Sequence, residues 1–527
     1  MDSSRLTEIR RNQAISAYAQ LNPNTTHFPS EANVVHKGMG GMSEVFQGRV
    51  VGMLPPMTST VSTEDPQTQE ELIQNAIISA TTNLLSYMAT VNSGPTICSR
   101  LMYLFFFSLT SSYNAIVGGG SGIHDGWNWS TRYALSTDTL YSWIQQTLAF
   151  CLPNLIPGWS NGITTYTPAF TVFATAWTTW FSGRAADGNV AAKTAPSYTV
   201  LNHNGTAITY LETTTSQDFT NTTYYQNPAK WTPLSINGAN KNYLTYGWGS
   251  VTSPSLSAAD ETSIIAAATP LNATGAARTA EIASLLSLSQ TLTDEQKVIA
   301  EFWAGGPNTI TPPGMCLWFW REYMVSQSIT DLNTLFFSGL DLCVAIFEAS
   351  RLCWNLKGTQ LQARPIQEIR RTGGGTVTKY DGTTIARNVW VPYQPANVVT
   401  PPFPDFPSGH STFSQSFANV MTDWFGPTLT PAPAPFTGVS LFSPMIRTSQ
   451  AGNTFGTFTI SAGSSEVQPG VVPAAPVTLT FSTWQAIADQ AGNSRQYGGI
   501  HAASADVGGK AVANAIRPRQ KNNWPLR

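Results

Sequence analysis

The sequence predicts a mainly α-helical fold made of two helical-bundle halves and long irregular loops. Several segments carry apolar residues at the three- and four-residue spacing of a helix with one buried face. A chain of 527 residues that is 42% hydrophobic can also bury a large core. The stretches at about 155–255 and 426–480 are instead rich in Thr, Asn and Gly and are expected to be strand-like or irregular. The predicted helices are Glu71–Tyr87, Ile97–Ile116, Asp260–Ala268, Ala276–Leu288, Asp294–Trp303, Leu317–Ser326, Leu332–Leu356, Ser408–Trp424 and Thr483–Ala491.

The most apolar run of the chain, Leu101–Val117, is predicted to be a buried helix rather than a membrane span. A span needs roughly 20 apolar residues, and this run is shorter and broken by polar side chains such as Ser108 and Asn114. The segment Thr167–Phe181 mixes Thr and Ala with aromatic residues and is expected to be core or interface. We therefore expect no membrane-spanning segment.

Composition divides the chain into four segments. Residues 1–45 are polar and are expected to form an arm across a neighbouring subunit of a homo-oligomer. Residues 46–290 form the N-terminal helical half, which contains the Thr/Asn-rich insertion, and residues 291–515 form the half that carries the motifs described below. Residues 516–527 are a basic tail, expected to be a flexible or docking end.

Charge is sparse and balanced. Lys and Arg number 28 and Asp and Glu number 30, a net charge of −2, and charged residues make up only 11% of the chain, compared with about 25% in ordinary domains. Nucleic-acid binding depends on clustered Lys and Arg that neutralise phosphates, and no such cluster is present. We therefore expect no nucleic-acid partner.

The start of the chain and its cysteines indicate a reducing, internal environment. The first residues are polar, with no continuous apolar segment of the kind found in secretion signals. We therefore expect a soluble, intracellular protein by default. The cysteines are odd in number and lack metal-site spacing, so they are expected to be reduced thiols. They are Cys98, Cys151, Cys316, Cys343 and Cys353.

The first chemistry-bearing motif pairs two cations. Lys357 and Arg364 are seven residues apart, so on one helix they would project from the same face, about 10 Å apart along the axis. Arginine presents a planar fork to two oxyanion oxygens, and lysine adds a point charge. Pro365 is expected to end the helix and to leave Arg364 at the edge of a loop.

The second motif, Pro-Ser-Gly-His, is predicted to lie at the start of a helix. Apolar residues such as Phe413, Phe417 and Met421 follow it at helical spacing. Ser408 is therefore placed to cap this helix. The free amides from Gly409 onward, at the positive end of the helix dipole, would then form an anion-binding corner.

The third motif adds another cation and a second histidine. Arg495 follows Ser494, and His501 lies six residues further on. Two imidazoles, His410 and His501, suit chemistry on a tetrahedral anion, because one can bond to the central atom while the other moves protons. Together the three motifs predict a pocket that grips a tetrahedral oxyanion.

The motifs KxxxxxxRP, PSGH and SRxxxGxH, in this order, resemble the signature of the superfamily that unites vanadium-dependent haloperoxidases with the type 2 phosphatidic acid phosphatases, or acid phosphatases. Two further stretches resemble the haloperoxidase-like branch: Phe302–Ala304 followed by Thr311–Gly314, and Gly94–Thr96 followed by Arg100. The resemblance covers roughly residues 80–515. It implies the acid phosphatase/vanadium haloperoxidase core and a haloperoxidase-like catalytic half at 291–515.

The resemblance implies vanadate as cofactor, with phosphate able to occupy the same site. His501 matches the axial vanadium ligand, and His410 matches the acid–base histidine. Trp354 and Phe403 match aromatic residues that line the halide side of the pocket in chloroperoxidase-like members. The positions that match the groups holding the equatorial oxygens are Lys357, Arg364, Arg495, Ser408 and Gly409.

This sequence departs from the family pattern at two places. Acid phosphatases carry an aspartate after the last histidine, and Asp506 lies one residue further along than that pattern requires. We expect Asp506 to support the site from behind, and the shift favours a peroxidase over a phosphatase. Relatives also carry an acidic partner for the arginine matching Arg495 where this chain has two glycines. That leaves Asp341 and Asp294 as candidate partners.

The resemblance implies a vanadate-dependent haloperoxidase that uses hydrogen peroxide to oxidise halide and so halogenates a small organic acceptor. The first alternative is a soluble acid phosphatase in which His501 is the nucleophile and His410 the acid. A second alternative is a structural or assembly protein with a vestigial pocket, in which extensive contacts would explain the low charge.

Overall fold

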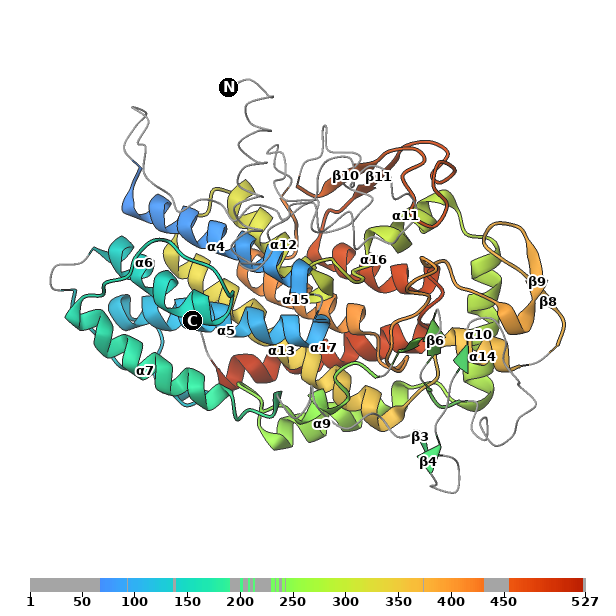
Figure 1. Cartoon of the computed structure of the whole chain (residues 1–527), viewed down its shortest axis with the longest axis horizontal. Coiled ribbons are helices and arrows are strands. Elements are labelled where there is room, and N and C mark those ends of the chain that lie inside the picture. The colour runs from blue at the N-terminus through green and yellow to red at the C-terminus, as the bar shows by residue number, and fades with distance from the viewer. Residues whose placement is uncertain are drawn as a thin grey trace, which may run out of the picture.

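The computed structural model describes residues 67–524, apart from residues 92, 136–138, 190–199, 202–206, 209–211, 214–228, 233, 237–238, 242, 373 and 431–454. The expected arm at residues 1–45 lies outside the described residues. Long helices run side by side along the longest axis of the molecule (Figure 1). The prediction of a mainly α-helical fold is confirmed.

The described part of the N-terminal half starts with α4 (Gln69–Val91), α5 (Pro95–Val117), α6 (Leu140–Cys151) and α7 (Pro168–Arg184). As predicted, α5 is a buried helix, and Phe105, Phe106 and Phe107 are fully enclosed. The expectation of strand-like or irregular structure from 155 is wrong for α7. Its buried aromatic residues recur at helical spacing and outweigh the weak helix propensity of its threonines. They are Phe170, Phe173, Trp177 and Trp180.

Four further helices lead to the second half: α9 (Ala258–Ala268), α10 (Gly275–Gln290), α11 (Asp294–Phe302) and α12 (Thr311–Ser326). Capping boxes fix two of these starts. Ser257 caps α9 together with Asp260, and Thr293 caps α11 together with Gln296. Each box satisfies backbone amides that have no partner within the helix.

The central helix is α13 (Leu332–Gln360), which packs against α5, α12 and α15. By length and composition α13 alone among the described helices could cross a membrane, but 89% of its most apolar window is buried inside the molecule. Such burial is typical of a core helix. Cys343 and Cys353 lie on it. All five cysteines are free, as expected, and all are buried.

The remaining helices are α14 (Pro365–Arg371), α15 (Gly409–Phe425), α16 (Trp484–Tyr497) and α17 (Ala503–Asn523). The basic segment from 516, expected to be a flexible or docking tail, instead continues α17 through Asn523. Arg517 is only 8% exposed and forms a bidentate pair with Asp341 of α13, at 2.7 and 2.8 Å. Trp524, just beyond α17, is also buried.

The strands are short and form small separate sheets. Within the described residues, β1–β2, β3–β4, β8–β9 and β10–β11 are antiparallel pairs. In a further sheet, β5 runs parallel to β6, which pairs antiparallel with β7. The strands are β1 (Ile123–His124), β2 (Trp127–Asn128), β3 (Val200–Leu201), β4 (Ala207–Ile208), β5 (Glu212–Thr213), β6 (Leu234–Ile236), β7 (Ala239–Lys241), β8 (Thr376–Thr378), β9 (Thr384–Ala386), β10 (Thr457–Ile460) and β11 (Val477–Thr480). Short 3₁₀ helices are η1 (Leu152–Asn154), η2 (Tyr246–Ser250), η3 (Thr269–Leu271) and η4 (Arg387–Val389).

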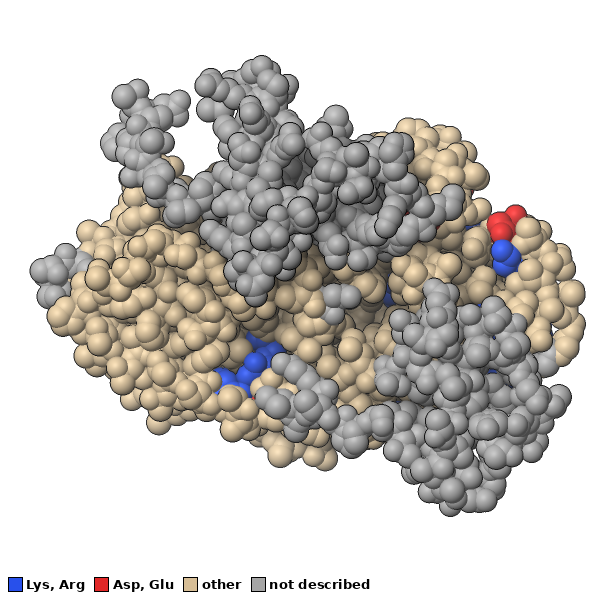
Figure 2. Space-filling model, viewed as in Figure 1, with Lys and Arg blue, Asp and Glu red and all other residues tan. Residues whose placement is uncertain are grey.

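One large apolar core joins the two halves. It includes buried residues of α4, α5, α7, α12, α13, α15 and α16. The described part of the face in Figure 2 carries few Lys, Arg, Asp or Glu side chains, in keeping with the low charge of the sequence.

Candidate anion-binding active site

Lys357 and Arg364 come from two helices, not from one face of a single helix. α13 ends at Gln360, and Leu361 takes a left-handed conformation with φ of 50°. Arg364 is the N-cap of α14, and Pro365 is its first residue, a position where the missing amide hydrogen costs nothing. The helix predicted to end at Pro365 therefore ends earlier. Arg364 lies at a helix start, in the loop that joins the two.

The Pro-Ser-Gly-His motif starts α15, as predicted. The Ser408 side chain accepts a hydrogen bond from the Ser411 amide at 3.3 Å, which makes it the N-cap. Gly409 and His410 are then the first residues of the helix. Backbone amides of a first helical turn have no acceptor within the helix, and they point toward the positive end of its dipole.

Arg495, on α16, is compensated by backbone carbonyls rather than by a carboxylate. Its Nη2 donates to Ala300 O at 2.6 Å, in the last turn of α11, where unpaired carbonyls concentrate negative charge. The two aspartates considered as its partners lie elsewhere. Asp341 pairs with Arg517, and Asp294 accepts from the Ala474 amide at 2.6 Å.

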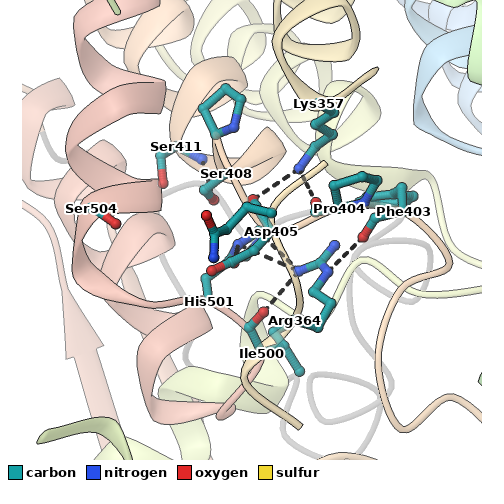
Figure 3. Close-up of polar contacts among 12 residues, drawn as sticks. Lys357, Arg364, Phe403, Pro404, Asp405, Ser408, Ser411, Ile500, His501 and Ser504 are labelled. Carbon is teal, nitrogen blue, oxygen red and sulfur yellow. Dashed lines mark hydrogen bonds and ion pairs between the residues drawn. The ribbon is translucent and has the colours of Figure 1, made fainter. Parts of the chain in front are cut away.

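His501 is held between an arginine and a carboxylate. Arg364 Nη1 lies 3.0 Å from His501 Nε2, and His501 Nδ1 lies 2.5 Å from Asp405 Oδ1 (Figure 3). Because a guanidinium only donates, Nε2 accepts and Nδ1 carries the proton. Burial and the Arg364 charge lower the pKa of His501 to about 3, so the ring is neutral with a lone pair on Nε2.

Asp405 is the site residue that the sequence reasoning missed. It is fully buried, and its Oδ2 accepts from Arg278 Nη2 of α10 at 2.8 Å. Burial alone would raise its pKa, but Arg278 and His501 hold that pKa below the usual range. The available signal was its place three residues before Ser408, in Pro-Phe-Pro-Asp-Phe-Pro-Ser-Gly-His.

Asp506, which the sequence suggested as a support for the site, has a different partner. Its Oδ2 pairs with Lys510 Nζ at 3.0 Å, one turn along α17. The carboxylate that contacts His501 is Asp405 instead. The acid that supports the last histidine thus precedes the Pro-Ser-Gly-His motif rather than following His501.

His410 is fixed by a backbone carbonyl. Its Nε2 lies 2.7 Å from Trp303 O, which can only accept, so Nε2 carries a proton. Burial and the nearby Arg495 lower the pKa of His410 well below its ordinary value. The ring is therefore neutral, and its Nδ1 is left as the proton-accepting nitrogen.

Positive charge is concentrated behind the two histidines. Lys357 Nζ donates to Pro404 O at 2.6 Å and to Asp405 O at 3.0 Å, and Arg364 Nε donates to Phe403 O at 2.7 Å. All three acceptors are neutral backbone carbonyls. Burial lowers the pKa values of the cations, that of Lys357 to about 7, of Arg364 to about 10 and of Arg495 to about 9. Such buried positive charge is stabilised by a bound anion.

A cavity of about 310 Å³ opens onto this cluster. Lys357, Arg364 and Ser408 are fully buried and lie behind its wall. The predicted site residues that line it are Gly409, His410, Arg495, His501, Trp354 and Phe403.

The two aromatic residues proposed for the halide side are neighbours in this wall. The Trp354 and Phe403 rings have centroids 4.8 Å apart at an angle of 52°. Lys357 Nζ and the Arg364 guanidinium carbon lie 5.1 and 5.0 Å from the Phe403 ring centre, within cation–π range. Phe403 thus contacts the cations and also borders the cavity.

Residues 339–520 match the family described as the VCPO second helical-bundle domain. This range contains every residue of the three motifs. The match assigns residues 339–520 to this domain family. No curated protein matches the sequence.

Solved structures of vanadium-dependent peroxidases have the same fold. A holo-type bacterial vanadium-dependent chloroperoxidase is 14% identical, with a TM-score of 0.57 over 82% of this chain and 93% of its own. The apo-type form gives a TM-score of 0.55 at the same identity, over 81% and 96%. A bacterial vanadium-dependent iodoperoxidase is 16% identical, with a TM-score of 0.55 over 88% and 98%.

The residues present fit a vanadate ion. Arg364 Nη2 is buried and has no hydrogen-bond partner among the described residues, so one donor of the site is still unused. Within the described ranges no three His, Cys, Asp or Glu side chains gather to hold a cation. The groups present are those of an oxyanion site. Guanidinium groups, an ammonium group and helix-start amides can donate hydrogen bonds to the oxygens, and one imidazole lone pair can bond to the central atom.

Proposed function

We propose that the protein is a vanadate-dependent haloperoxidase, which uses hydrogen peroxide to oxidise halide to a hypohalous-acid-like electrophile that halogenates an organic acceptor. One observation carries the proposal. Three buried cations, two of them behind the wall of one cavity and one lining it, lie around a neutral, lone-pair-bearing His501, and Asp405 is the carboxylate that contacts this histidine. The likeness to vanadium-dependent peroxidases supports it.

Vanadate, when bound, supplies a Lewis acid that activates peroxide without changing oxidation state. His501 Nε2 would be its protein ligand, and Arg364, Lys357 and Arg495 would hold the charge of its oxygens. Asp405 keeps the Nδ1 proton of His501 in place, so the lone pair stays on Nε2. The second imidazole, His410, would take the peroxide proton on Nδ1.

A second candidate function is phosphate-ester hydrolysis, because vanadate resembles the transition state of phosphoryl transfer. The contact between His501 and Asp405 favours this function as well. A neutral histidine backed by a buried carboxylate is an activated nucleophile, and His501 with Asp405 has that form. His410 would then protonate the leaving alcohol, which requires the charge of the bound ester to raise its pKa from the lowered value of the anion-free site.

The deciding experiment measures bromination of phenol red with bromide and hydrogen peroxide, before and after loading with vanadate. We expect bromination only after loading, and none in the His501→Ala variant. Hydrolysis of p-nitrophenyl phosphate by the vanadate-free protein, inhibited by vanadate and without any bromination, would instead assign the phosphatase function. Neither activity, in protein that binds vanadate, would contradict both.

A further inference from the structure

The cavity in front of the anion site has walls almost free of charge. Its floor holds His410, His501 and Arg495, and Glu466 is the other ionisable residue among the described residues that line it. The rest of the wall is largely apolar. Its main apolar side chains are Pro95, Leu244, Pro312, Trp354, Val398 and Phe403.

This wall is preformed. Prolines restrict the backbone at several places around it, and the Trp354 indole is fixed by a hydrogen bond from its Nε1 to Leu244 O at 3.0 Å. Two residues after Leu244, η2 begins at Tyr246 and packs against α13. A ligand therefore meets a shape that does not need to be ordered first, which favours binding. The lining prolines are Pro95, Pro307, Pro312, Pro395, Pro401 and Pro402.

The chemistry of the wall selects the ligand. Apart from Glu466 and Arg495, the described lining offers a charged molecule no opposite charge to compensate for its lost hydration. An uncharged aromatic ring would instead bury apolar surface against Trp354 and Val398. A volume of about 310 Å³ suits a single or fused ring system.

We propose that this cavity is an acceptor site, which holds an uncharged, electron-rich aromatic compound beside the anion site while it is halogenated. The inference rests on the proposed haloperoxidase function. In the transfer step, a ring carbon bonds to the halogen of the hypohalous acid as the halogen–oxygen bond breaks. The oxygen leaves with the bonding pair as hydroxide and combines with the displaced ring proton to give water.

The binding test uses three compounds with the same ring: neutral indole, anionic indole-3-acetate and cationic tryptamine. Calorimetric titration of the full-length protein measures binding without turnover, and phosphate buffer is chosen to occupy the anion site. We expect indole to bind saturably and both charged compounds to bind at least tenfold more weakly. Equal binding of all three would overturn the proposal.

Two valine variants place this binding in the cavity. Val398→Asp puts a charge into the wall and is expected to weaken indole binding at least tenfold. Val172→Asp is the matched control, because Val172 is 58% exposed on α7 and does not line the cavity. Indole binding unchanged in Val398→Asp would show that the cavity is not the acceptor site.

A competition experiment separates this proposal from the proposed function. Vanadate-loaded protein is given peroxide, bromide and an equimolar mixture of indole and tryptamine, and the product ratio is compared with that from reagent hypobromous acid. We expect at least a tenfold shift toward brominated indole, which disappears in Val398→Asp. The reagent ratio from the wild type would overturn the acceptor site while leaving the haloperoxidase function intact. Saturable indole binding without any bromination would contradict the function and leave the binding site standing.

Discussion

His501 Nδ1 lies 2.5 Å from Asp405 Oδ1 in the buried interior, and this contact determines which ring nitrogen faces the anion. The carboxylate only accepts, so the Nδ1 proton stays on that side and the Nε2 lone pair points toward Arg364. Arg278 and Glu368 extend the contact into a buried network of alternating charge.

We predict that Asp405→Asn weakens vanadate binding by about 10–100-fold, the usual effect of losing a carboxylate behind a ligating histidine. An asparagine can present its amide hydrogens to Nδ1, which would move the ring proton to Nε2 and remove the lone pair from the site. Calorimetric titration measures the affinity, and ¹⁵N spectra of the imidazole nitrogens report the tautomer of His501.

The control for this variant is Asp423→Asn, which also removes a carboxylate paired with an arginine, Arg517, but away from the cavity. It should bind vanadate as the wild type does. Asp405→Asn with unchanged affinity and an unchanged His501 tautomer would contradict the assigned role of Asp405.

Anion affinity should fall as the pH rises, because burial lowers the pKa of Lys357 to about 7. A bound anion favours the protonated form of Lys357. Above pH 7, Lys357 must therefore take up a proton when the anion binds. Sulfate is a suitable probe, because its own charge does not change between pH 6 and 9. We expect its affinity to decrease by up to about tenfold per pH unit above pH 7. In Lys357→Met, affinity should be lower at pH 6 and nearly independent of pH between 6 and 8.

The same shift predicts how stability depends on pH in the anion-free protein. Folding lowers the pKa of Lys357 from 10.5 to about 7, so between these values the unfolded chain binds the extra proton. The contribution of Lys357 to stability therefore increases as the pH rises through this window. At pH 6, Lys357→Met should have a higher thermal midpoint than the wild type without anion. A lower thermal midpoint for Lys357→Met than for the wild type at pH 6 would contradict the burial of a charged lysine.

Arg364→Lys keeps a positive charge and removes the planar fork. Because Arg364 Nη2 has no partner among the described residues, we assign that nitrogen to the bound anion. Lysine has a single nitrogen, which cannot contact the anion and also keep the hydrogen bonds of Arg364 to Phe403 O and Ile500 O, so vanadate affinity should fall by about tenfold. Arg371→Lys, on the same helix α14, is the control and should bind normally. Equal affinity in both variants would contradict this contact.

The end of α17 is predicted to be structural. Asp341 accepts from both Arg517 and Gln520 of α17 and from Trp424 of α15. Asp341→Ala should destabilise the protein by about 3 kcal/mol, because it leaves a buried arginine with one partner fewer. The exposed pair of Asp381 with Lys379 supplies the control, and Asp381→Ala should cost less than about 1 kcal/mol. Similar thermal midpoints for the two variants would argue against a structural role for residues 516–524.

Much of this architecture could be predicted from the sequence, because helical spacing and motif order are local. The start of α15 at Ser408 follows from a capping serine and the apolar residues after it. α7 is not predicted, because its threonines favour strands, although its aromatic residues have helical spacing. The two separate helices that carry Lys357 and Arg364 depend on a left-handed turn at Leu361, for which the sequence holds no glycine or asparagine signal.

The contacts of the site were harder to predict than its members. A carboxylate partner for Arg495 is predicted from the sequence, but this arginine is satisfied by a carbonyl at the end of α11. The predicted support of His501 follows that histidine, whereas the observed one, Asp405, lies 96 residues before it. Such pairings are set by tertiary packing, which no local pattern encodes.

The most direct test of the anion site is a titration of the purified protein with vanadate, with phosphate as competitor. We predict one vanadate per chain, displaced by phosphate, with a higher thermal midpoint in the bound form, since a ligand that binds only the folded chain stabilises it. Two results would contradict the claim that Arg364 and His501 bind the anion. One is that vanadate does not bind saturably, and the other is that it binds equally well to a variant that combines Arg364→Lys with His501→Ala.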